Sequence, residues 1–420
     1  MKDLQAIALA AFLFVPVLAP LAQAQQPASI SSGTIDLQQV LEAVRRGNPE
    51  ILAAHKRWEA GRQRIAQAAT PDKPRLDIER MYAPSRSDML GKPDEKAVAI
   101  TQELPFPTVL YLRRGLAVKD AAMQEQSYRA KLLEVCARAR AVYAMLFLAE
   151  KSISIYDENV GIMRRFSKVA ESRVSSGRGR QSDALKAQVE LTKMLNMQVT
   201  LEQEREAFQS MLNALMGRDA HAALGSAQEP PSAAVILNAE ELESSALSDR
   251  PELREALLAS ERAEQSLALA RSEFLPDLML QHRQRSDPAK GRTYDAILGF
   301  SLPLWFWRPA AMVREAKSER ELAQAELSAA RLSTQAELKT TWSRARAAQR
   351  LLEAYRTTLL PQAEASLKFA ESGYQSDQTG FLDLLDAQRS WLSFKLEYYR
   401  YMVEFEQRLA ELERIVGREL

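Results

Sequence analysis

The chain has 420 residues, a formal net charge of +1 and 26% charged residues. This balance argues against a basic nucleic-acid-binding surface, so no nucleic-acid partner is expected. The single cysteine, Cys136, excludes an intrachain disulfide, and we expect it to be a packed, unreactive thiol in a helix. The 15 Gly and 18 Pro leave long uninterrupted stretches rich in Ala, Leu, Glu, Gln and Arg, a composition typical of long helices.

The N-terminal residues have the pattern of a secretory signal. Lys2 precedes an apolar run from about residue 6 to residue 19, and Ala22-Gln23-Ala24 supplies small residues for cleavage. We therefore expect residues 1–24 to be a signal peptide. Gln25 follows, so no lipid anchor is expected there. The apolar run is too short to span a bilayer, which leaves an exported chain that is either soluble or spans a membrane as a β-barrel.

The first half of the mature chain is predicted to hold a helix, two strands and two very long helices. Apolar residues at 3- and 4-residue steps predict a helix from Asp36 to Ala69, interrupted at Asn48-Pro49. Alternating apolar and charged residues predict strands over about 74–82 and 96–104. Proline is absent from Thr108 to Glu229, which allows a helix of roughly 100 Å. The first repeat then covers residues 25–217, with a helical hairpin over about 108–217.

The same series occurs again in the second half. Asn48-Pro49-Glu50 returns as Arg250-Pro251-Glu252, and Pro74-Arg75-Leu76 returns as Pro276-Asp277-Leu278, both at a spacing of 202 residues. Pro361 interrupts the second long helix, and we expect a kink there. The expected divisions are a linker at 218–240 and a second repeat at 241–420, with strands over about 277–284 and 293–302 and a helical hairpin over about 309–417.

One stretch in each half marks the duplication most clearly. Residues 171–188 and residues 371–388 share seven of 18 positions without gaps, whereas chance gives roughly one at ordinary residue frequencies. Each stretch ends one long helix, turns and begins the next helix. The sequence therefore predicts two copies of a helical hairpin.

Four strands per chain cannot close a barrel, and a two-stranded hairpin is not stable alone. We expect other copies to complete the sheet, and a trimer would supply twelve strands, an even number in the range of outer-membrane barrels. Aromatic residues lie at both ends of the strands and would form two girdles at membrane interfaces, although packing at a strand–helix corner is the alternative. These residues are Tyr82 and Tyr294 at the loop ends and Phe106, Trp305 and Trp307 at the helix ends.

Together these motifs resemble the TolC family of outer-membrane efflux channels over nearly the whole mature chain. The stretches that carry the resemblance are Asn48-Pro49-Glu50, Arg250-Pro251-Glu252, Pro276-Asp277-Leu278, Leu360-Pro361-Gln362-Ala363-Glu364, Tyr374 and residues 381–388, FLDLLDAQ. The resemblance implies a mainly α fold with a small β part. Duplicated long-helix hairpins would form a trimeric α-helical barrel, topped by a 12-stranded transmembrane β-barrel with four strands per chain.

The resemblance also implies a location, partners and cargo. A homotrimer would sit in the outer membrane, in contact with its lipid, with the helical tunnel in the periplasm. A periplasmic adaptor (membrane fusion protein) would open it, and an inner-membrane pump of the RND type would supply the energy. Gln102-Glu103-Leu104-Pro105-Phe106-Pro107 looks most like the branch that serves heavy-metal cation efflux. The chain would then be a passive conduit for small solutes or metal cations, with type I protein secretion as the alternative.

Within the resemblance, four residues have roles at the periplasmic end. Asp383 and Asp386 match the positions that ring the pore constriction. Three residues apart, they share a helix face, and trimer symmetry would make rings of carboxylates that favour cations. The alternative, above all for Asp383, is an acid that interacts with the helix N-terminus. Asp183 and Tyr374 match a closed-state latch, with a capping acid and a packed tyrosine as the alternative.

The two turns are expected to face the adaptor, and their charges differ. The first turn is basic, the second is acidic, and Asp377 stands where the first turn has Gly177. Aspartate tolerates a left-handed conformation less well than glycine. The family's basic latch residue is not matched, since Thr379 occupies its position. We expect Arg178 or Arg180 near Asp377 or the adaptor. The expected adaptor-facing residues are Gly177, Arg178, Gly179, Arg180, Asp377 and Gly380.

Nothing in the chain predicts an enzyme. The three histidines, His55, His221 and His282, fall in a helix, a linker and a strand end, without the spacing of a catalytic or metal site. We therefore expect no catalytic residue, no metal site and no cofactor, and any choice of metal would be made by the pump. A non-channel periplasmic coiled-coil structural protein is the competing interpretation, but it has no use for a repeated, proline-bounded β-hairpin.

Overall fold

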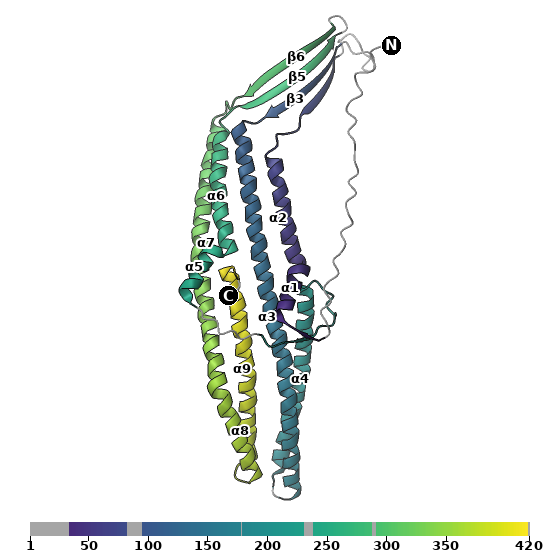
Figure 1. Cartoon of the computed structure of the whole chain (residues 1–420), viewed down its shortest axis with the longest axis vertical. Coiled ribbons are helices and arrows are strands. Elements are labelled where there is room, and N and C mark those ends of the chain that lie inside the picture. Colours follow the sequence, from purple (N-terminus) through teal and green to yellow (C-terminus); the bar gives the residue numbers. More distant parts are fainter. Residues whose placement is uncertain (1–32, 82–94, 178, 231–237, 288–290, 419–420) are drawn as a thin grey trace, which may run out of the picture.

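The computed structural model describes residues 33–81, 95–177, 179–230, 238–287 and 291–418. The expected signal peptide, Tyr82 and Arg178 lie outside the described residues. The described part is mainly helical with a small sheet, as predicted. It is elongated, with the strands at one end and the helices along the long axis (Figure 1). No helix in these ranges is both long and apolar enough to cross a membrane.

Strands from both halves build one antiparallel four-stranded sheet in the order β2-β3-β5-β6. They are β2 (Arg75–Met81), β3 (Glu95–Leu104), β5 (Asp277–Asp287) and β6 (Gly291–Ser301). The hairpins of the two halves join along β3 and β5, where Leu104 pairs with Leu278. Among the described residues β2 and β6 are the edges of the sheet, and each pairs on one side only.

One face of the sheet is apolar and exposed. Side chains alternate between the two faces along a strand, and the strand register places apolar residues of all four strands on the same face. Exposed residues on this face are Leu76, Ile78, Val98, Ile100, Leu280, Tyr294, Leu298 and Phe300. The described chain leaves this face exposed to its surroundings.

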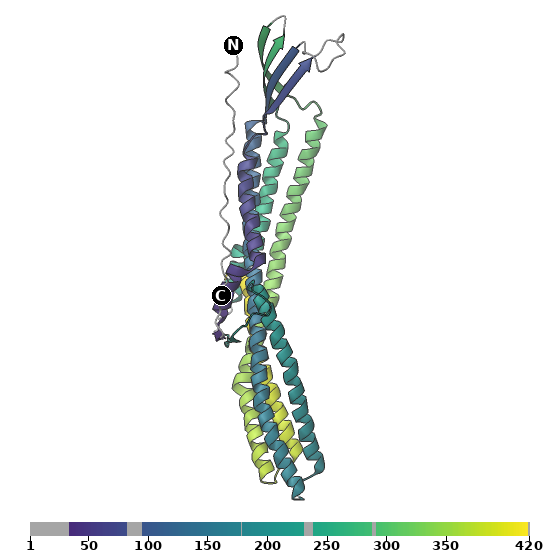
Figure 2. The same ribbon diagram turned by 90° about the vertical axis from the view of Figure 1, so that its right-hand side faces the viewer.

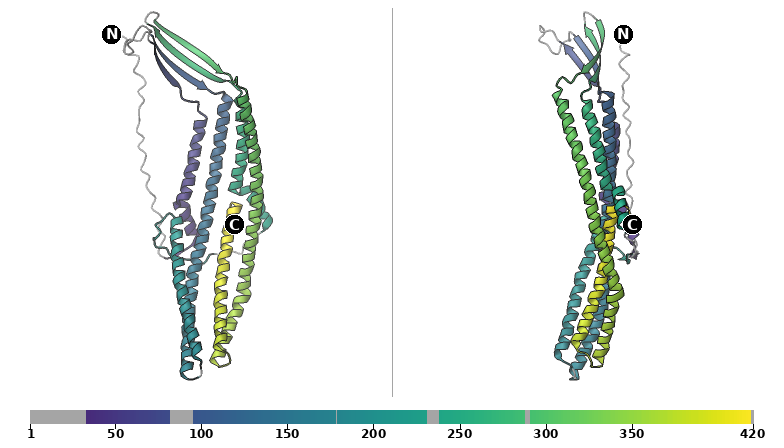
Figure 3. Two further views of the ribbon diagram at one scale, coloured as in Figure 1. Left: turned by 180° about the vertical axis from the view of Figure 1, so that it is seen from behind. Right: turned by 90° about the vertical axis from the view of Figure 1, so that its left-hand side faces the viewer.

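Each half contributes one long helical hairpin and two shorter helices. In the first half these are α1 (Leu37–Gly47), α2 (Pro49–Ala68), α3 (Pro107–Ser175) and α4 (Gln181–Leu215). In the second half they are α5 (Ala239–Asp249), α6 (Pro251–Ser272), α7 (Trp307–Ala354), α8 (Leu360–Gln375) and α9 (Phe381–Val416). α2 and α6 run beside the part of α3 and α7 near the sheet, and α4 and α9 run beside the far part (Figures 1, 2 and 3).

The expected interruption at Pro361 takes the form of a π-helical segment, η1 (Tyr355–Leu359), between α7 and α8. Proline lacks an amide hydrogen, and its ring clashes with the carbonyl four residues earlier. The wider π turn, in which the Leu360 amide donates to the Tyr355 carbonyl oxygen, makes room for the ring. The Tyr355 hydroxyl donates to Glu397 on α9, and this hydrogen bond raises the pKa of Tyr355 to about 12.

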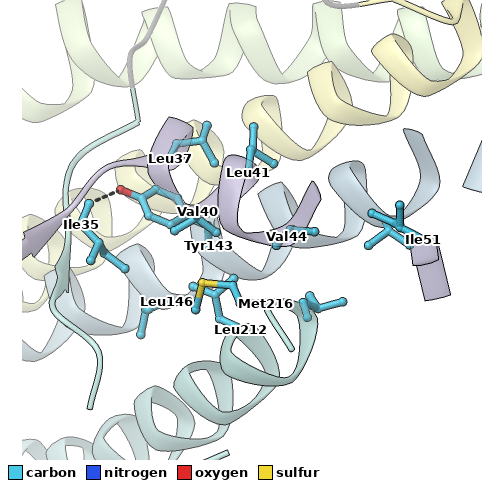
Figure 4. Close-up of a cluster of buried hydrophobic side chains, with 13 residues drawn as sticks. Ile35, Leu37, Val40, Leu41, Val44, Ile51, Tyr143, Leu146, Leu212 and Met216 are labelled. Carbon is cyan, nitrogen blue, oxygen red and sulfur yellow. Dashed lines mark hydrogen bonds between the residues drawn. The ribbon is translucent and has the colours of Figure 1, made fainter. Parts of the chain in front are cut away.

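A cluster of buried apolar side chains lies near the middle of the long axis, where α1, α3 and α4 meet (Figure 4). Val44 and Tyr143 are buried in it, and Cys136 packs against it, as expected for a packed thiol. The Tyr143 hydroxyl lies 2.9 Å from the carbonyl oxygens of both Ile35 and Gln228 and shares its hydrogen between them. This cluster holds the N-terminal segment and the linker against α3.

Two very short strands in that region were not predicted from the sequence. β1 (Thr34–Ile35) pairs in parallel with β4 (Ser226–Ala227). The Glu150 carboxylate on α3 accepts hydrogen bonds from the Ser226 hydroxyl and the Ala227 amide, both at 2.8 Å. Strands of two residues carry no periodic signal, so the sequence indicated only a linker here.

Each return helix ends beside the start of a proline-led helix. After α4, Gly217 adopts φ +69°, and a Cβ there would lie 2.2 Å from the Gly47 carbonyl oxygen. After α9, Gly417 adopts φ +85°, and a Cβ there would lie 2.7 Å from the Asp249 carbonyl oxygen. Both the left-handed conformation and the close approach require glycine at these two ends.

Candidate functional site at the hairpin tips

The first hairpin turns between α3 and α4 through a left-handed residue. The Ser176 amide donates to the Ser172 carbonyl oxygen at 3.1 Å, and the Gly179 amide donates to the Arg173 carbonyl oxygen at 2.9 Å. Between them Gly177 has φ +73°, which glycine adopts without strain. Apart from its two chain neighbours, no described residue has an atom within 4 Å of the place of a Gly177 Cβ, so only the backbone conformation favours glycine there.

The second hairpin repeats this geometry with different residues. The Thr379 amide donates to the Gly373 carbonyl oxygen at 3.2 Å, and Asp377 takes the left-handed position with φ +65°. Asp377 is the one non-glycine residue with positive φ in the described ranges. A Cβ on Gly373 would lie 2.7 Å from Cγ2 of Thr379. The threonine side chain therefore fills the inside of this turn.

Arg173, near the end of α3, connects the two turns. One guanidinium nitrogen lies 2.9 Å from the Asp377 carboxylate, and another donates to the Tyr374 carbonyl oxygen at 2.6 Å. The guanidinium carbon also lies 4.3 Å from the centre of the Tyr374 ring, a cation–π contact. The sequence had pointed to Arg178 or Arg180 for the neighbourhood of Asp377. Arg178 lies outside the described residues, Arg180 is exposed beside α4, and Arg173 makes the ion pair.

The expected latch residues, Tyr374 and Asp183, lie near each other within one chain. Tyr374 is buried, and its ring centre lies 5.6 Å from that of Phe381. Burial raises the pKa of the Tyr374 hydroxyl; the Asp183 carboxylate adds to the rise, and Arg173 opposes it. The Asp183 carboxylate accepts a hydrogen bond from the Ser182 hydroxyl at 3.3 Å. The direct contacts with Tyr374 come from Arg173, through the carbonyl oxygen and the ring of the tyrosine.

Asp383 and Asp386, the expected constriction residues, lie exposed near the start of α9. The Asp383 carboxylate accepts the Gly380 amide hydrogen at 3.1 Å, which is the capping contact of an acid in the first turn of a helix. Asp386 lies 3.6 Å from Arg389, and 72% of its side chain is exposed. The opposite face of α9 is buried. Its residues are Phe381, Leu384, Leu385 and Gln388. Both carboxylates therefore lie on the exposed side of α9 in the single chain.

An ion pair further from the turns joins α4 to α9. Glu190 is buried and accepts hydrogen bonds from Arg389 on α9 and from Lys193 at 3.1 Å. Burial alone would raise the pKa of Glu190, but the two cations outweigh this effect and lower the pKa. Because Arg389 also faces Asp386, it links the expected constriction to the first hairpin. The sequence did not indicate this contact, since the partners are 199 residues apart.

A buried polar pair, Asn159 and Gln388, lies between α3 and α9. Both residues are fully buried, and the Gln388 side-chain amide donates to Oδ1 of Asn159 at 2.9 Å. The equivalent residue of the first repeat, Gln188, is exposed and donates to Glu171 at 3.3 Å. Matching residues of the two copies thus have different surroundings.

Aromatic side chains border the sheet at the opposite end of the molecule. Trp305 lies between β6 and α7, and Trp307 is the first residue of α7. The two side chains are 67% and 56% exposed, and their ring centres lie 5.2 Å apart. Phe106, between β3 and α3, is half-buried. Tyr294, near the loop end of β6, is exposed and stacks on His282. The described aromatics therefore lie near both ends of the strands.

The described residues contain no cluster of side chains that could bind a metal ion. No group of three or more His, Cys, Asp or Glu side chains is arranged there to hold a metal ion. The acids near the tips lie beside arginines, and His55 packs against Trp58 and Tyr128.

A sheet with an exposed apolar face, continued by two very long helical hairpins, is the architecture of an outer-membrane channel. The profile of the family described as "Outer membrane efflux protein" matches residues 40–218 and again residues 242–418. The chain therefore belongs to the outer membrane efflux protein family. It resides in the outer membrane, with its helical tunnel in the periplasm.

Individual relatives agree with this family. The chain is 24% identical over 396 residues to the cobalt-zinc-cadmium resistance protein CzcC of Cupriavidus metallidurans, covering 92% of this chain and 91% of CzcC. Its fold is similar to that of CusC, with TM-score 0.79, 16% identity and coverage of 91% and 92% of the two chains. OprN gives TM-score 0.77, 19% identity and coverage of 91% and 89%. The predicted resemblance to TolC-family channels is confirmed.

Proposed function

We propose that the protein is the outer-membrane channel of a tripartite efflux system and acts as a homotrimer. The sheet carries this proposal. Its edge strands β2 and β6 pair on one side only in the described part of the chain, and one face is apolar and exposed. Unpaired strand edges favour pairing with further chains. Three copies joined edge to edge would close a barrel of twelve strands, so that every backbone group in lipid has a partner.

The helices would continue this barrel as a tunnel across the periplasm. α3 alone has 69 residues, which is about 100 Å of helix. The two hairpin turns lie at the far end of the molecule from the sheet (Figure 1). In the trimer this end would be the periplasmic entrance, with Asp383 and Asp386 around the constriction and with Asp183 and Tyr374 in the closed-state latch.

Energy and opening would come from partners. A periplasmic adaptor would dock on the exposed turns, and an inner-membrane pump of the RND type would drive export. The first turn offers Arg180 and the second offers Asp377, both exposed, so the adaptor would meet alternating basic and acidic tips around the ring. The channel itself would be a passive conduit.

The cargo we favour is a divalent metal cation. The name of the relative CzcC refers to resistance to cobalt, zinc and cadmium. Exposed carboxylates at the tip, repeated by threefold symmetry, would attract cations into the entrance. Small organic solutes and exported proteins are the other cargoes that a conduit of this kind could pass.

Planar-bilayer recording of the purified trimer tests the channel. Wild-type protein should form cation-preferring channels, and Asp386→Asn should weaken the preference because it removes three charges from one level of the pore. Glu202→Gln is the matched control, since this exposed acid lies on α4 far from the turns. A purified trimer that forms no channels would overturn the proposal, and equal cation preference in Asp386→Asn and wild type would remove Asp386 from the constriction.

Growth assays of a deletion strain test the cargo. Loss of the gene should increase sensitivity to zinc, cobalt or cadmium ions, and the wild-type gene should restore resistance. Unchanged metal sensitivity together with greater sensitivity to dyes or detergents would point to small organic solutes. Loss of one exported protein from the medium would point to type I secretion.

A further inference from the structure

We infer that a row of three basic side chains on the apolar face of the sheet is a binding site for a phosphate-bearing lipid headgroup of the outer leaflet. The residues of this basic row are Arg80 on β2, Lys96 on β3 and Arg292 on β6. The inference rests on the proposed barrel, because this face of the sheet meets lipid only if the sheet lies in the membrane. The site lies at the end of the molecule opposite the hairpin turns (Figure 1).

The strand register places the three cations side by side. Arg80 pairs with Lys96 across β2 and β3. Lys96 also pairs with Ser286 on β5, which in turn pairs with Arg292. Paired residues of neighbouring strands point to the same face of a sheet, and the strands lie about 4.8 Å apart. The three basic side chains therefore form one line across the four strands, and each of them is exposed.

The described strands carry no acidic residue on this face. Side chains alternate along a strand, and the register places the even-numbered residues of all four strands on the apolar face. The acidic residues of the strands are all odd-numbered and lie on the other face. They are Asp77, Glu79, Glu95, Glu103, Asp277, Asp287 and Asp295. The basic row therefore has no acidic neighbour on its own face of these strands.

Cations on the two faces of the sheet have different neighbours. On the other face, Arg285 lies 3.1 Å from Glu95 and 3.9 Å from Asp295. On the apolar face, Arg80 and Lys96 stand directly opposite each other, and like charges in this position destabilise the pairing of two strands. An anion that binds from outside the chain would offset this repulsion.

Protection of the sheet edges does not account for the basic row. Charged side chains, lysine above all, hinder unwanted pairing when they lie on an edge strand. Lys96 lies on β3, which pairs with β2 on one side and with β5 on the other. Its charge is therefore not placed to guard an edge, and it adds to the charges of Arg80 and Arg292 on the neighbouring strands.

The basic row lies at the end of the apolar face that is farthest from the helices (Figure 1). Leu278, paired with Leu104 and Phe300, lies near the helices, eight residues before Ser286. At about 3.4 Å per residue this is about 27 Å of strand, or about 20 Å of membrane depth at a tilt near 40°. Tyr294, in the row next to the basic row, is exposed and suits the boundary between hydrocarbon and headgroups. Because the helices extend into the periplasm, the basic row is at the height of the headgroups of the outer leaflet.

Guanidinium and ammonium groups at one height fit a phosphorylated headgroup. A guanidinium donates two parallel hydrogen bonds to two oxygens of one phosphate, and an ammonium adds a point charge. Each basic side chain near an anionic membrane surface strengthens binding about fivefold. The occupant that we name is lipid A, the outer-leaflet lipid whose sugar headgroup carries phosphates. Three copies of the chain would repeat the basic row around the barrel.

Lipid binding by the purified protein in detergent tests the site. Native mass spectrometry measures the affinity for diphosphorylated lipid A, monophosphoryl lipid A and phosphatidylcholine. One variant is the triple substitution Arg80→Gln/Lys96→Gln/Arg292→Gln, and a second is Ser286→Lys, which adds a fourth cation to the row. Arg75→Gln is the matched control, because Arg75 is an exposed arginine of β2 on the other face of the sheet.

Wild type should bind diphosphorylated lipid A more tightly than the monophosphoryl form, and phosphatidylcholine most weakly. The triple variant should bind lipid A about a hundredfold more weakly, since three contributions of about fivefold multiply. Ser286→Lys should bind lipid A about fivefold more tightly, a gain that no folding defect can mimic, and Arg75→Gln should match wild type. Equal affinity of the triple variant and Arg75→Gln for lipid A would overturn the site. If the triple variant does not assemble, Ser286→Lys decides, and unchanged affinity overturns the site.

Free phosphate and failure of the proposed function give different results. Displacement of lipid A from wild type by inorganic phosphate at equal concentration would overturn the lipid as the occupant. If the wild-type protein forms no channels in planar bilayers but lipid A binding changes in the variants as expected, the conduit is wrong and the site stands. Normal channels, together with equal lipid A affinity in the triple variant and wild type, support the conduit and overturn the site.

Discussion

The two junctions at the middle of the molecule have the same backbone but different chemistry. In the first half Asn48 is buried, caps α2 through the amides of Glu50 and Ile51, and donates to the Leu215 carbonyl oxygen at 2.8 Å. In the second half Arg250 takes the same place and pairs with Glu337 at 2.8 Å. Each junction thus has a buried polar residue that binds across it. In the first copy this residue is the neutral helix cap Asn48, and in the second copy it is Arg250, which forms ion pairs.

The two turns also have the same backbone geometry but different side chains. Gly177 and Asp377 occupy equivalent left-handed positions, but only the aspartate carries a side chain that reaches the other hairpin. In the second turn Asp377 therefore has a strained backbone conformation, and its side chain contacts Arg173. In both comparisons the backbone is the shared property, and the side chains set how each copy meets its neighbours.

Among these predictions, substitution of the junction glycines Gly217 and Gly417 should lower the free energy of unfolding the most. Gly217→Ala combines a left-handed conformation with a Cβ placed 2.2 Å from a carbonyl oxygen, and Gly417→Ala does the same at 2.7 Å. Each should lower the free energy of unfolding by roughly 2–4 kcal/mol, measured by chemical denaturation. Gly161→Ala is the control, because its Cβ meets nothing within 4 Å in the described residues, and it should stabilise α3 by about 1 kcal/mol. Similar stability of all three variants would contradict the shared requirement.

Asn48→Ala should have the next largest effect and should act on the first junction. It removes a helix cap and leaves the buried Leu215 carbonyl oxygen without this donor, so a loss of about 2 kcal/mol in unfolding free energy is expected. Asn238→Ala is the control, since Asn238 caps α5 through the Glu240 amide but is exposed. Asn238→Ala should lower the free energy of unfolding by about 1 kcal/mol or less. A smaller loss for Asn48→Ala than for Asn238→Ala would refute the role of burial at this junction.

The second junction should differ from the first in its response to acid. Burial alone would raise the pKa of Glu337, but Arg250 and Arg414 outweigh it and lower the pKa below the ordinary value of 4.5. A lowered folded-state pKa means that Glu337 stabilises the fold above about pH 4.5 and that this contribution is lost as pH falls through the folded-state value.

Melting temperatures between pH 7 and pH 3 test this difference. The gap between wild type and Glu337→Gln should be largest near neutral pH and should close as the pH falls below 4.5. Glu326→Gln, an exposed acid on the same helix, should give a curve parallel to wild type. A gap that stays constant over this range would show that Glu337 does not titrate with folding.

Exchanging Gly177 and Asp377, the left-handed residues of the two turns, should change the free energy of unfolding the least. Gly177→Asp should lower the unfolding free energy by about 0.5–1 kcal/mol, because aspartate is strained at φ +73°. Asp377→Gly should raise it by a similar amount when measured in an Arg173→Gln background, in which the ion pair is already absent. Thermal unfolding of wild type, Gly177→Asp, Arg173→Gln and the Arg173→Gln/Asp377→Gly double variant measures the sign of both changes in unfolding free energy. Equal signs would show that backbone strain does not separate the two turns.

Local signals predicted much of the architecture because they act through a few neighbouring residues. Pro107 stands in the first turn of α3, Gly417 follows the last residue of α9, and period-two alternation marks β3. The mainly helical class with a small sheet and the channel family followed from such patterns and their repetition. The short pair β1–β4 and the π-helical form of the break before Pro361 did not, since neither has a local pattern of its own.

The sequence by itself indicated the long helices, the four strands of the sheet and the duplication of the chain. Only the tertiary structure decided which side chains meet: Arg173 with Asp377, 204 residues apart, and Gln388 with Asn159, 229 residues apart. The physical reason is that periodicity fixes which face of a helix is buried but not how far that helix slides or rotates against its neighbour. The residues of the two turns could therefore be named from the sequence, whereas Arg173, which contacts Asp377 and Tyr374, could not.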